Sequence, residues 1–213
     1  MKRTDAIFDY VVGPKVLDIG YVGQFLRRGS TNWLHDKLIN RNFDVWGIDI
    51  SREDVERDIK EGYRNLFVMN AEDFDLPTKF NTIIAGEIIE HVNNPGNFLQ
   101  NAFKHLEVGG QLIITTPQPF ALLYILYAVY KFPKTCPTWE HTIWFCPQTF
   151  RELAQRYAFT EKTFKLLEDY EPNVRSKPYT LTIEFIKYFG FLLPKLLRYN
   201  NMLFVLEKSI MGV

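Results

Sequence analysis

VLDIGYVG at 16–23 decides the fold expected of this 213-residue chain. The stretch has the pattern of a short buried strand that ends in an acidic residue and a glycine turn, where a parallel sheet brings backbone amides close to a ligand. A dinucleotide-binding turn would need glycine at 20, 22 and 25, but Val22 and Phe25 occupy the last two positions. The turn therefore predicts a ligand at the edge of the sheet and argues against a dinucleotide.

Apolar runs alternate with helical patterns along the rest of the chain, which predicts an α/β fold with a Rossmann-like, mostly parallel sheet and helices on both faces. Two later runs complete seven strands, and the last of them is expected to be antiparallel. The expected strands are 15–20, 44–50, 65–71, 80–86, 111–116, 163–167 and 203–208. The expected helices are 31–41, with Ser30 or Thr31 as its cap, 95–106, which Gly109 and Gly110 would stop, and 151–157.

Two aromatic-rich insertions, at about 118–146 and 171–200, interrupt this alternation. Both would leave the carboxyl edge of the sheet, so we expect them to form one cap over the ligand crevice. Their aromatic residues fit simple packing, an apolar or ring-bearing ligand, or peripheral contact with a membrane. In the membrane alternative Lys187, Lys195 and Arg198 would lie near lipid phosphates.

Composition bounds the remaining alternatives. Because 25 Lys and Arg balance 25 Asp and Glu, no bulk attraction to nucleic acid is expected. Cys136 and Cys146 are too few for a disulfide framework, and the first residues lack the apolar core of a signal peptide, so we expect a cytoplasmic location. The longest uncharged apolar run, 120–130, is shorter than the roughly 20 residues that a membrane crossing needs. We expect a single domain over 1–213.

Further motifs follow the expected strands in a fixed order. They are GIDIS at 47–51, NAED at 70–73, GEIIEHVNNPGNFL at 86–99, LEVGGQLIITTPQPF at 106–120 and EHTIWFCPQTFRELAQRYAF at 140–159. With VLDIG at 16–20, they resemble the class I S-adenosylmethionine-dependent methyltransferases, especially the ubiquinone-pathway O-methyltransferase branch. The resemblance implies that S-adenosylmethionine is the cofactor and that a methyl group goes to a small or lipid-like acceptor at oxygen.

The resemblance also assigns residues to the cofactor. They are Asp18 and Gly20 at its methionine end, Asp49 at the ribose, Ile50, Ala71 and Glu72 at the adenine, and Gly86 and Glu87 below the sulfonium. A carboxylate such as Asp49 can accept both ribose hydroxyl protons. From the residue alone, Asp49 could equally cap a helix beside Ser51.

The turn departs from the family pattern. Where the family has G-x-G-x-G, residues 20–24 read GYVGQ, and Gly23 would substitute by shifting the turn one residue. Arg27 or Arg28 could face the cofactor carboxylate or be solvated loop residues. The altered turn leaves two rivals to the enzyme: a cofactor-binding protein without catalysis, and a membrane-peripheral interaction protein on the same fold.

Two histidines are candidates for the chemical step. Methyl transfer to a hydroxyl needs a nucleophile held close to the methyl group and a base, and His91 and His141 could each be that base. Either could instead be a structural histidine, whereas His35 and His105 have surface-like settings.

A metal is the alternative use of this region. Glu87, Glu90 and His91 fall at i, i+3 and i+4, so one helical turn would present them together, and some members of the family bind a divalent metal with such an E-x-x-E-H cluster. The same carboxylates suit the start of a helix, near its positive dipole end. We favour the helix start and expect no metal.

Overall fold

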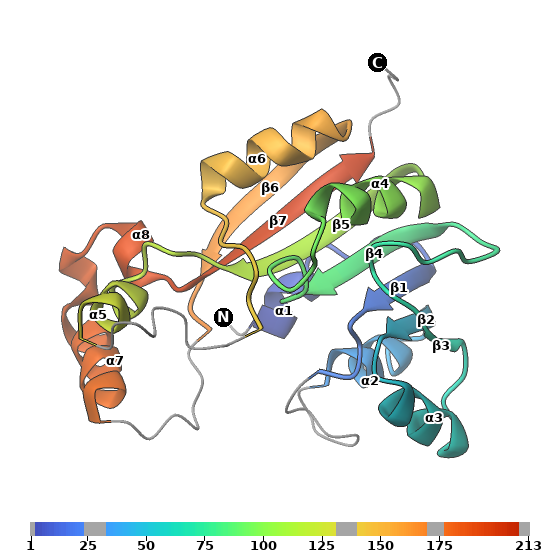
Figure 1. Ribbon diagram of the computed structural model, residues 1–213, viewed down its shortest axis with the longest axis horizontal. Helices are drawn as coiled ribbons and strands as arrows, with labels where there is room; N and C mark the ends of the chain where they lie inside the picture. Colours follow the sequence, from blue (N-terminus) through green and yellow to red (C-terminus); the bar gives the residue numbers. More distant parts are fainter. Residues whose placement is uncertain (1–2, 24–32, 131–139, 170–176, 209–213) are drawn as a thin grey trace.

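A seven-stranded sheet forms the centre of the computed structural model, which describes residues 3–23, 33–130, 140–169 and 177–208 (Figure 1). The strand order is β3-β2-β1-β4-β5-β7-β6, and β7 runs antiparallel to both β5 and β6 while the other pairs are parallel. The strands are β1 (Lys15–Ile19), β2 (Asp44–Asp49), β3 (Leu66–Val68), β4 (Phe80–Gly86), β5 (Leu106–Pro117), β6 (Phe159–Leu167) and β7 (Asn201–Lys208). The expected fold class is confirmed.

Helices cover both faces of this sheet. On one face α4 (Pro95–His105) and α6 (Pro147–Arg156) pack on the larger core through buried side chains such as Phe98 and Phe150. On the other face α1 (Arg3–Phe8) and α2 (Leu34–Ile39) bury Ile7 and Leu38. The remaining helices are α3 (Arg52–Lys60) beside β3, and α5 (Leu122–Tyr130), α7 (Lys177–Phe189), the 3-10 helix η1 (Gly190–Leu192) and α8 (Lys195–Arg198).

The expected element boundaries differ from the structure in a few places. The helix expected over 31–41 is described only as α2, with Trp33 at its N-cap position, and Ser30 and Thr31 lie outside the described residues. Gly109 and Gly110 do not stop α4, because the chain enters β5 at Leu106 and both glycines lie within that strand. β6 begins four residues before the expected strand, at Phe159, because β7 supplies a hydrogen-bonding partner along its whole length.

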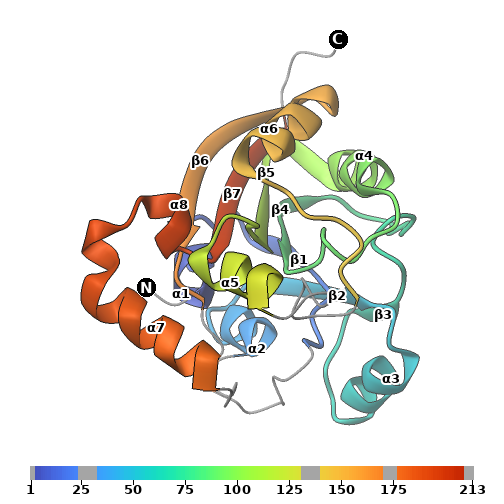
Figure 2. The same cartoon turned by 60° about the vertical axis from the view of Figure 1, so that its left-hand side comes forward.

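The two insertions meet in one layer of helices, in which α5 contacts both α7 and α8. Gln118 ties this layer to the sheet, since its side-chain amide donates to the carbonyl oxygens of Leu196, at 2.6 Å, and Tyr199. Figures 1 and 2 place the layer beyond the carboxyl end of β5, as expected for a cap. Trp139 and residues 170–176 lie outside the described residues. Among the helices described, none combines the length and apolar content needed to span a membrane.

The packing of β7 gives a test of the fold. Phe204 is fully buried, and its ring centroid lies 4.5 Å from that of Phe150 and 4.8 Å from that of Phe164. Phe204→Ala should lower the free energy of unfolding by about 3–5 kcal/mol, because it leaves a cavity between β7 and α6. Phe191→Ala, at a side chain 75% exposed, should change it by less than about 0.5 kcal/mol. Equal losses in urea denaturation would contradict this description of the core.

Candidate functional site

The strand order reverses between β1 and β4, the point at which open α/β sheets place a ligand crevice beyond the carboxyl ends of their strands. Asp18 pairs with Gly47 of β2 on one side and Ile84 of β4 on the other. Asp49 ends β2, Gly86 ends β4, and Ala71 follows β3, so the structure brings these expected cofactor residues to one edge of the sheet.

A buried polar contact with His35 holds Asp18. Oδ2 of Asp18 lies 3.1 Å from Nδ1 of His35, and His35 is completely buried. The surface-like setting expected for His35 is therefore wrong, because α2 turns this ring inward beneath β1 and β2. Trp33 and Tyr21 pack beside the imidazole, and the indole nitrogen of Trp33 donates to the Tyr21 carbonyl at 2.6 Å.

Aromatic packing replaces the missing glycines of the turn. Gly20 and Gly23 have φ of +71° and +62°, the left-handed region that glycine adopts without strain. A Cβ on Gly20 would also lie 2.1 Å from Cδ1 of Ile88. Tyr21 is buried against Gly47, where a Cβ would lie 2.9 Å from the ring. Arg27 and Arg28 lie outside the described residues.

Asp49 links this turn to the end of β2. Its carboxylate accepts hydrogen bonds from the backbone amides of Ser51, at 2.9 Å, and Val22, at 3.3 Å. Ser51, not Asp49, occupies the N-cap position of α3. Burial raises the pKa of Asp49, although the two amides oppose this shift. The carboxylate is thus fixed at the crevice with its position set by two donors.

Three further expected cofactor residues, Glu72, Ile50 and Gly86, have different surroundings. Both carboxylate oxygens of Glu72 accept backbone amides of the turn before α4, from Asn93 at 2.8 Å and Asn94 at 2.9 Å. Ile50 is 75% exposed, an apolar side chain standing at the crevice. A Cβ on Gly86 would meet only the Thr115 hydroxyl, at 3.6 Å, so packing within the chain does not require glycine there.

Residues outside the E-x-x-E-H motif bind the Glu87 carboxylate. Glu87 has a φ of +58°, and Oε1 accepts a hydrogen bond from Asn201 at 2.8 Å and pairs with Arg3 at 3.4 Å. Residues 87–91 form a turn, and α4 begins only at Pro95. The expected helix start at E-x-x-E-H is wrong, because the left-handed backbone at Glu87 breaks the helical spacing.

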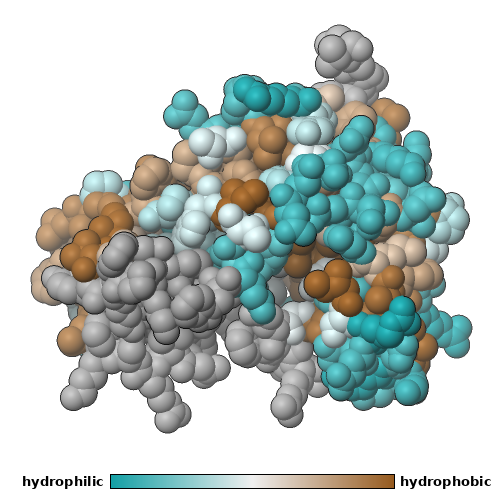
Figure 3. All heavy atoms as spheres, viewed as in Figure 1, coloured by the Kyte–Doolittle hydropathy of each residue, from teal (hydrophilic) through white to brown (hydrophobic). Residues whose placement is uncertain are grey.

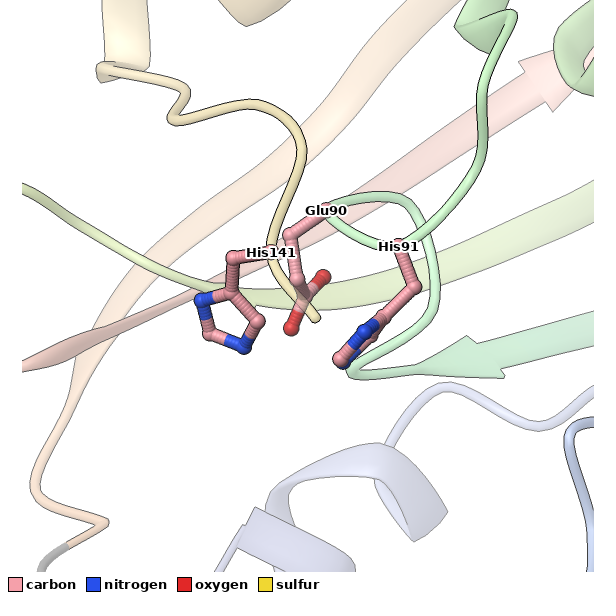
Figure 4. Close-up of side chains that lie close together, drawn as sticks. All are labelled: Glu90, His91 and His141. Carbon is pink, nitrogen blue, oxygen red and sulfur yellow. The ribbon is translucent and has the colours of Figure 1, made fainter. Parts of the chain in front are cut away.

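Three other side chains converge instead, Glu90, His91 and His141 (Figure 4). One ligand atom from each lies within 4.8 Å of those of the other two. His91 and His141 lie edge to face with centroids 4.7 Å apart. The backbone amide of Thr142 donates to the Glu90 carbonyl at 2.8 Å. This hydrogen bond holds the segment that contains His141 beside the turn that contains Glu90.

The polar contacts of His91 and Glu90 leave one atom of each available for chemistry. Nδ1 of His91 lies 3.2 Å from the Glu140 carbonyl and must donate to it, so Nε2 of a neutral ring keeps its lone pair. Thr116 donates to Oε2 of the buried Glu90 at 3.0 Å. Among the described residues, Oε1 of Glu90 has no hydrogen-bond partner. Nothing in the sequence pointed to Thr116 or Thr142 as supports of the cluster.

Burial sets the protonation of the cluster. It raises the pKa of Glu90 well above its usual range, with the Glu87 charge as a second cause. Burial, followed by the neighbouring His91, lowers the pKa of His141 to about 4. At neutral pH the His141 imidazole is therefore uncharged. Two nitrogens and one carboxylate oxygen could accept a proton or serve as three ligands of a divalent cation.

Neither His105 nor the groove along α6 belongs to this site. His105 is buried rather than surface-like, because Nε2 accepts the Leu76 amide at 3.2 Å and Nδ1 lies 2.9 Å from the Asn101 carbonyl. An open groove runs along α6, lined by residues such as Gln148 and Arg151. It lies away from the carboxyl ends of β1 and β2 (Figure 1).

Known proteins resemble this chain in sequence and in fold. The family model described as a methyltransferase domain matches residues 6–161. The ubiquinone biosynthesis O-methyltransferase of Alkalilimnicola ehrlichii is 27% identical over 62% of this chain and 55% of its own length. The chain thus spans about half the length of the curated relatives it matches.

Solved structures share the fold. An S-adenosylmethionine-dependent methyltransferase from Thermotoga maritima is similar over 97% of this chain and 87% of its own, with a TM-score of 0.66 and 17% identity. Magnesium protoporphyrin IX methyltransferase from Synechocystis, with bound S-adenosylhomocysteine, is similar over 97% of this chain and 81% of its own, with a TM-score of 0.60 and 14% identity.

The protonation of His141 can be measured directly. In metal-free buffer, the Cε1 proton resonance of His141 should titrate near pH 4 rather than near the ordinary histidine value of about 6.5. His91→Asn should raise this pKa, because it removes one cause of the depression. His141→Asn assigns the resonance, and titration of His141 near pH 6.5 in both proteins would mean that the cluster is open to water.

Proposed function

This chain belongs to the class I S-adenosylmethionine-dependent methyltransferases, and we propose that it transfers a methyl group from that cofactor to a hydroxyl oxygen of a small or lipid-like acceptor. The proposal depends chiefly on one observation: Gly20, Asp49 and Gly86 meet at the carboxyl edge where the strand order reverses. The family relationship supplies the reaction, and the histidine cluster at the same edge supplies a place for it.

The cofactor residues fit an extended nucleoside ligand. Asp49 would accept the ribose hydroxyls, with Ile50 and the backbone of Ala71 and Glu72 on the adenine. Gly86 would let the methionine end approach the backbone, because it presents no side chain there, and the left-handed backbone at Gly20 would turn the chain beside it. Asp18 and Gly23 would complete that end. Glu87 would act indirectly, since Arg3 and Asn201 already bind its carboxylate.

The chemical step is an in-line displacement. The acceptor oxygen attacks the methyl carbon, the carbon–sulfur bond breaks, and S-adenosylhomocysteine leaves with the bonding electron pair. The hydroxyl proton would go to His141, whose imidazole is uncharged at neutral pH, or to His91. A divalent cation also fits Glu90, His91 and His141, and when bound it would acidify a hydroxyl as a Lewis acid.

The acceptor is proposed from the relatives and from the surroundings of the cluster. The sequence relatives named above are O-methyltransferases of ubiquinone biosynthesis, which supports oxygen as the atom methylated. Trp144 lies between the cluster and the cap, with its ring centroid 5.9 Å from that of His141 and 5.0 Å from that of Tyr124 on α5. This aromatic wall supports an apolar or ring-bearing acceptor.

Calorimetry with S-adenosylhomocysteine tests the cofactor site. Asp49→Ala should weaken binding by about 10- to 100-fold, because two charge-assisted hydrogen bonds to the ribose are lost. Asp44→Ala removes an exposed carboxylate from the opposite end of the same strand and should leave affinity unchanged. Melting of the ligand-free variants checks that the turn at Val22 survives. A wild-type protein that gives no heat with the ligand would refute the proposal.

Turnover with labelled S-adenosylmethionine tests the histidines. With an alkylated phenol as acceptor, His141→Asn and His91→Asn should lower kcat by about 100-fold, because the proton acceptor is lost, while S-adenosylhomocysteine affinity stays within about threefold. We expect turnover to persist in EDTA. Loss of turnover that Mg²⁺ or Zn²⁺ restores would make the cluster a metal centre, and unchanged kcat in both variants would exclude the cluster from the reaction. Binding without turnover on any hydroxylated acceptor would favour the non-catalytic rival.

A further inference from the structure

Helix α7 carries apolar side chains on two opposite faces. Ile183 and Ile186 are buried on one of them. Leu181, Phe185 and Tyr188 follow one another at helical spacing on the other face, and all three are exposed. The exposed face is not needed to pack the helix, because the buried face already does so.

The exposed apolar surface continues into η1 and α8. Phe191 and Leu192 are 75% and 70% exposed, and Tyr188 reaches 75%. In Figure 3 brown atoms gather at the left-hand end, where Figure 1 places α5, α7 and α8. We call this surface the α7–α8 face. Its members are Leu181, Phe185, Tyr188, Phe189, Phe191, Leu192 and Leu196.

The charge of the same segment is basic. Residues 177–198 contain four basic residues and a single acidic one, Glu184. Lys187 and Lys195 are exposed beside the aromatic side chains. Arg198, which the sequence also suggested for lipid phosphates, instead pairs with Glu168 at 3.0 Å and holds α8 against the end of β6. Two lysines therefore supply positive charge at the surface.

We propose that the α7–α8 face docks on an anionic lipid surface. Phenylalanine and tyrosine rings suit the boundary between headgroups and acyl chains, where an apolar ring is buried and a hydroxyl stays wet. Lysines beside them are attracted to lipid phosphates. A second copy of the chain is the other occupant that such an apolar face could take, and the oligomeric state in solution distinguishes the two.

The position of the α7–α8 face suggests how docking on a lipid surface would help the reaction. The cap is tied to the end of β5 through Gln118, and Tyr124 on α5 is joined through Trp144 to His141. An apolar acceptor held in a bilayer would thus lie on the side of the molecule that carries the histidine cluster. This purpose rests on the proposed function, whereas docking itself does not.

Sedimentation with vesicles tests the docking. The full chain should bind vesicles of phosphatidylcholine mixed with phosphatidylglycerol, and bind weakly to phosphatidylcholine alone. The double variant Tyr188→Ser, Phe191→Ser should lose about tenfold or more in binding, because two exposed rings no longer enter the bilayer. Lys187→Gln with Lys195→Gln should weaken binding only to the anionic vesicles and reduce its dependence on salt.

Matched controls separate this inference from its alternatives. Val108→Ser removes a comparable exposed apolar side chain, 67% exposed, from the amino end of β5 and should bind vesicles like the wild type. Equal loss in this control, or no vesicle binding by the wild type, would overturn the proposal. So would a wild-type dimer in light scattering that the double variant converts to a monomer, because a second copy would then cover the face. S-adenosylhomocysteine binding, measured in the same variants, reports separately on the proposed function.

Discussion

The reversal of strand order between β1 and β4 is the constraint on which the functional features of this chain depend. Parallel strands on either side of this point carry their connections away in opposite directions, so the carboxyl ends of β1 and β4 stay uncovered. Because no helix covers the backbone at these strand ends, other contacts must fix its position. In this chain the buried pair of Asp18 and His35 holds β1, and the Asp49 carboxylate holds the turn that follows.

The same constraint explains how a glycine-poor turn is accommodated. Tyr21 occupies a position where the family has a residue between glycines, and its ring fills the space above Gly47 rather than the crevice. Trp33 and His35 close the other side of this ring. The turn thus gains apolar packing in place of backbone freedom: Ile88 fills the space beside Gly20, while a Cβ on Gly86 would meet only the Thr115 hydroxyl.

Local pattern predicted the sheet well, because apolar runs such as those of β1, β4 and β5 report burial directly. Local pattern does not predict contacts between residues that are distant in the sequence. His141 reaches Glu90 only because Thr142 pairs with the turn after β4, and no spacing reveals that contact. His35 was misjudged because only the fold places Asp18 above α2. The E-x-x-E-H spacing is common to a helix and to this turn, and the left-handed backbone of Glu87 decided between them.

We propose that the carboxyl edge of the sheet holds the cofactor with its reactive end toward the histidine cluster. A crystal structure of the chain with S-adenosylhomocysteine tests it most directly. We expect the ribose hydroxyls on the Asp49 carboxylate, the adenine beside Ile50, and the sulfur over Gly86 facing Glu90, His91 and His141. A ligand found in the groove along α6, or one whose sulfur points away from the three side chains, would contradict it.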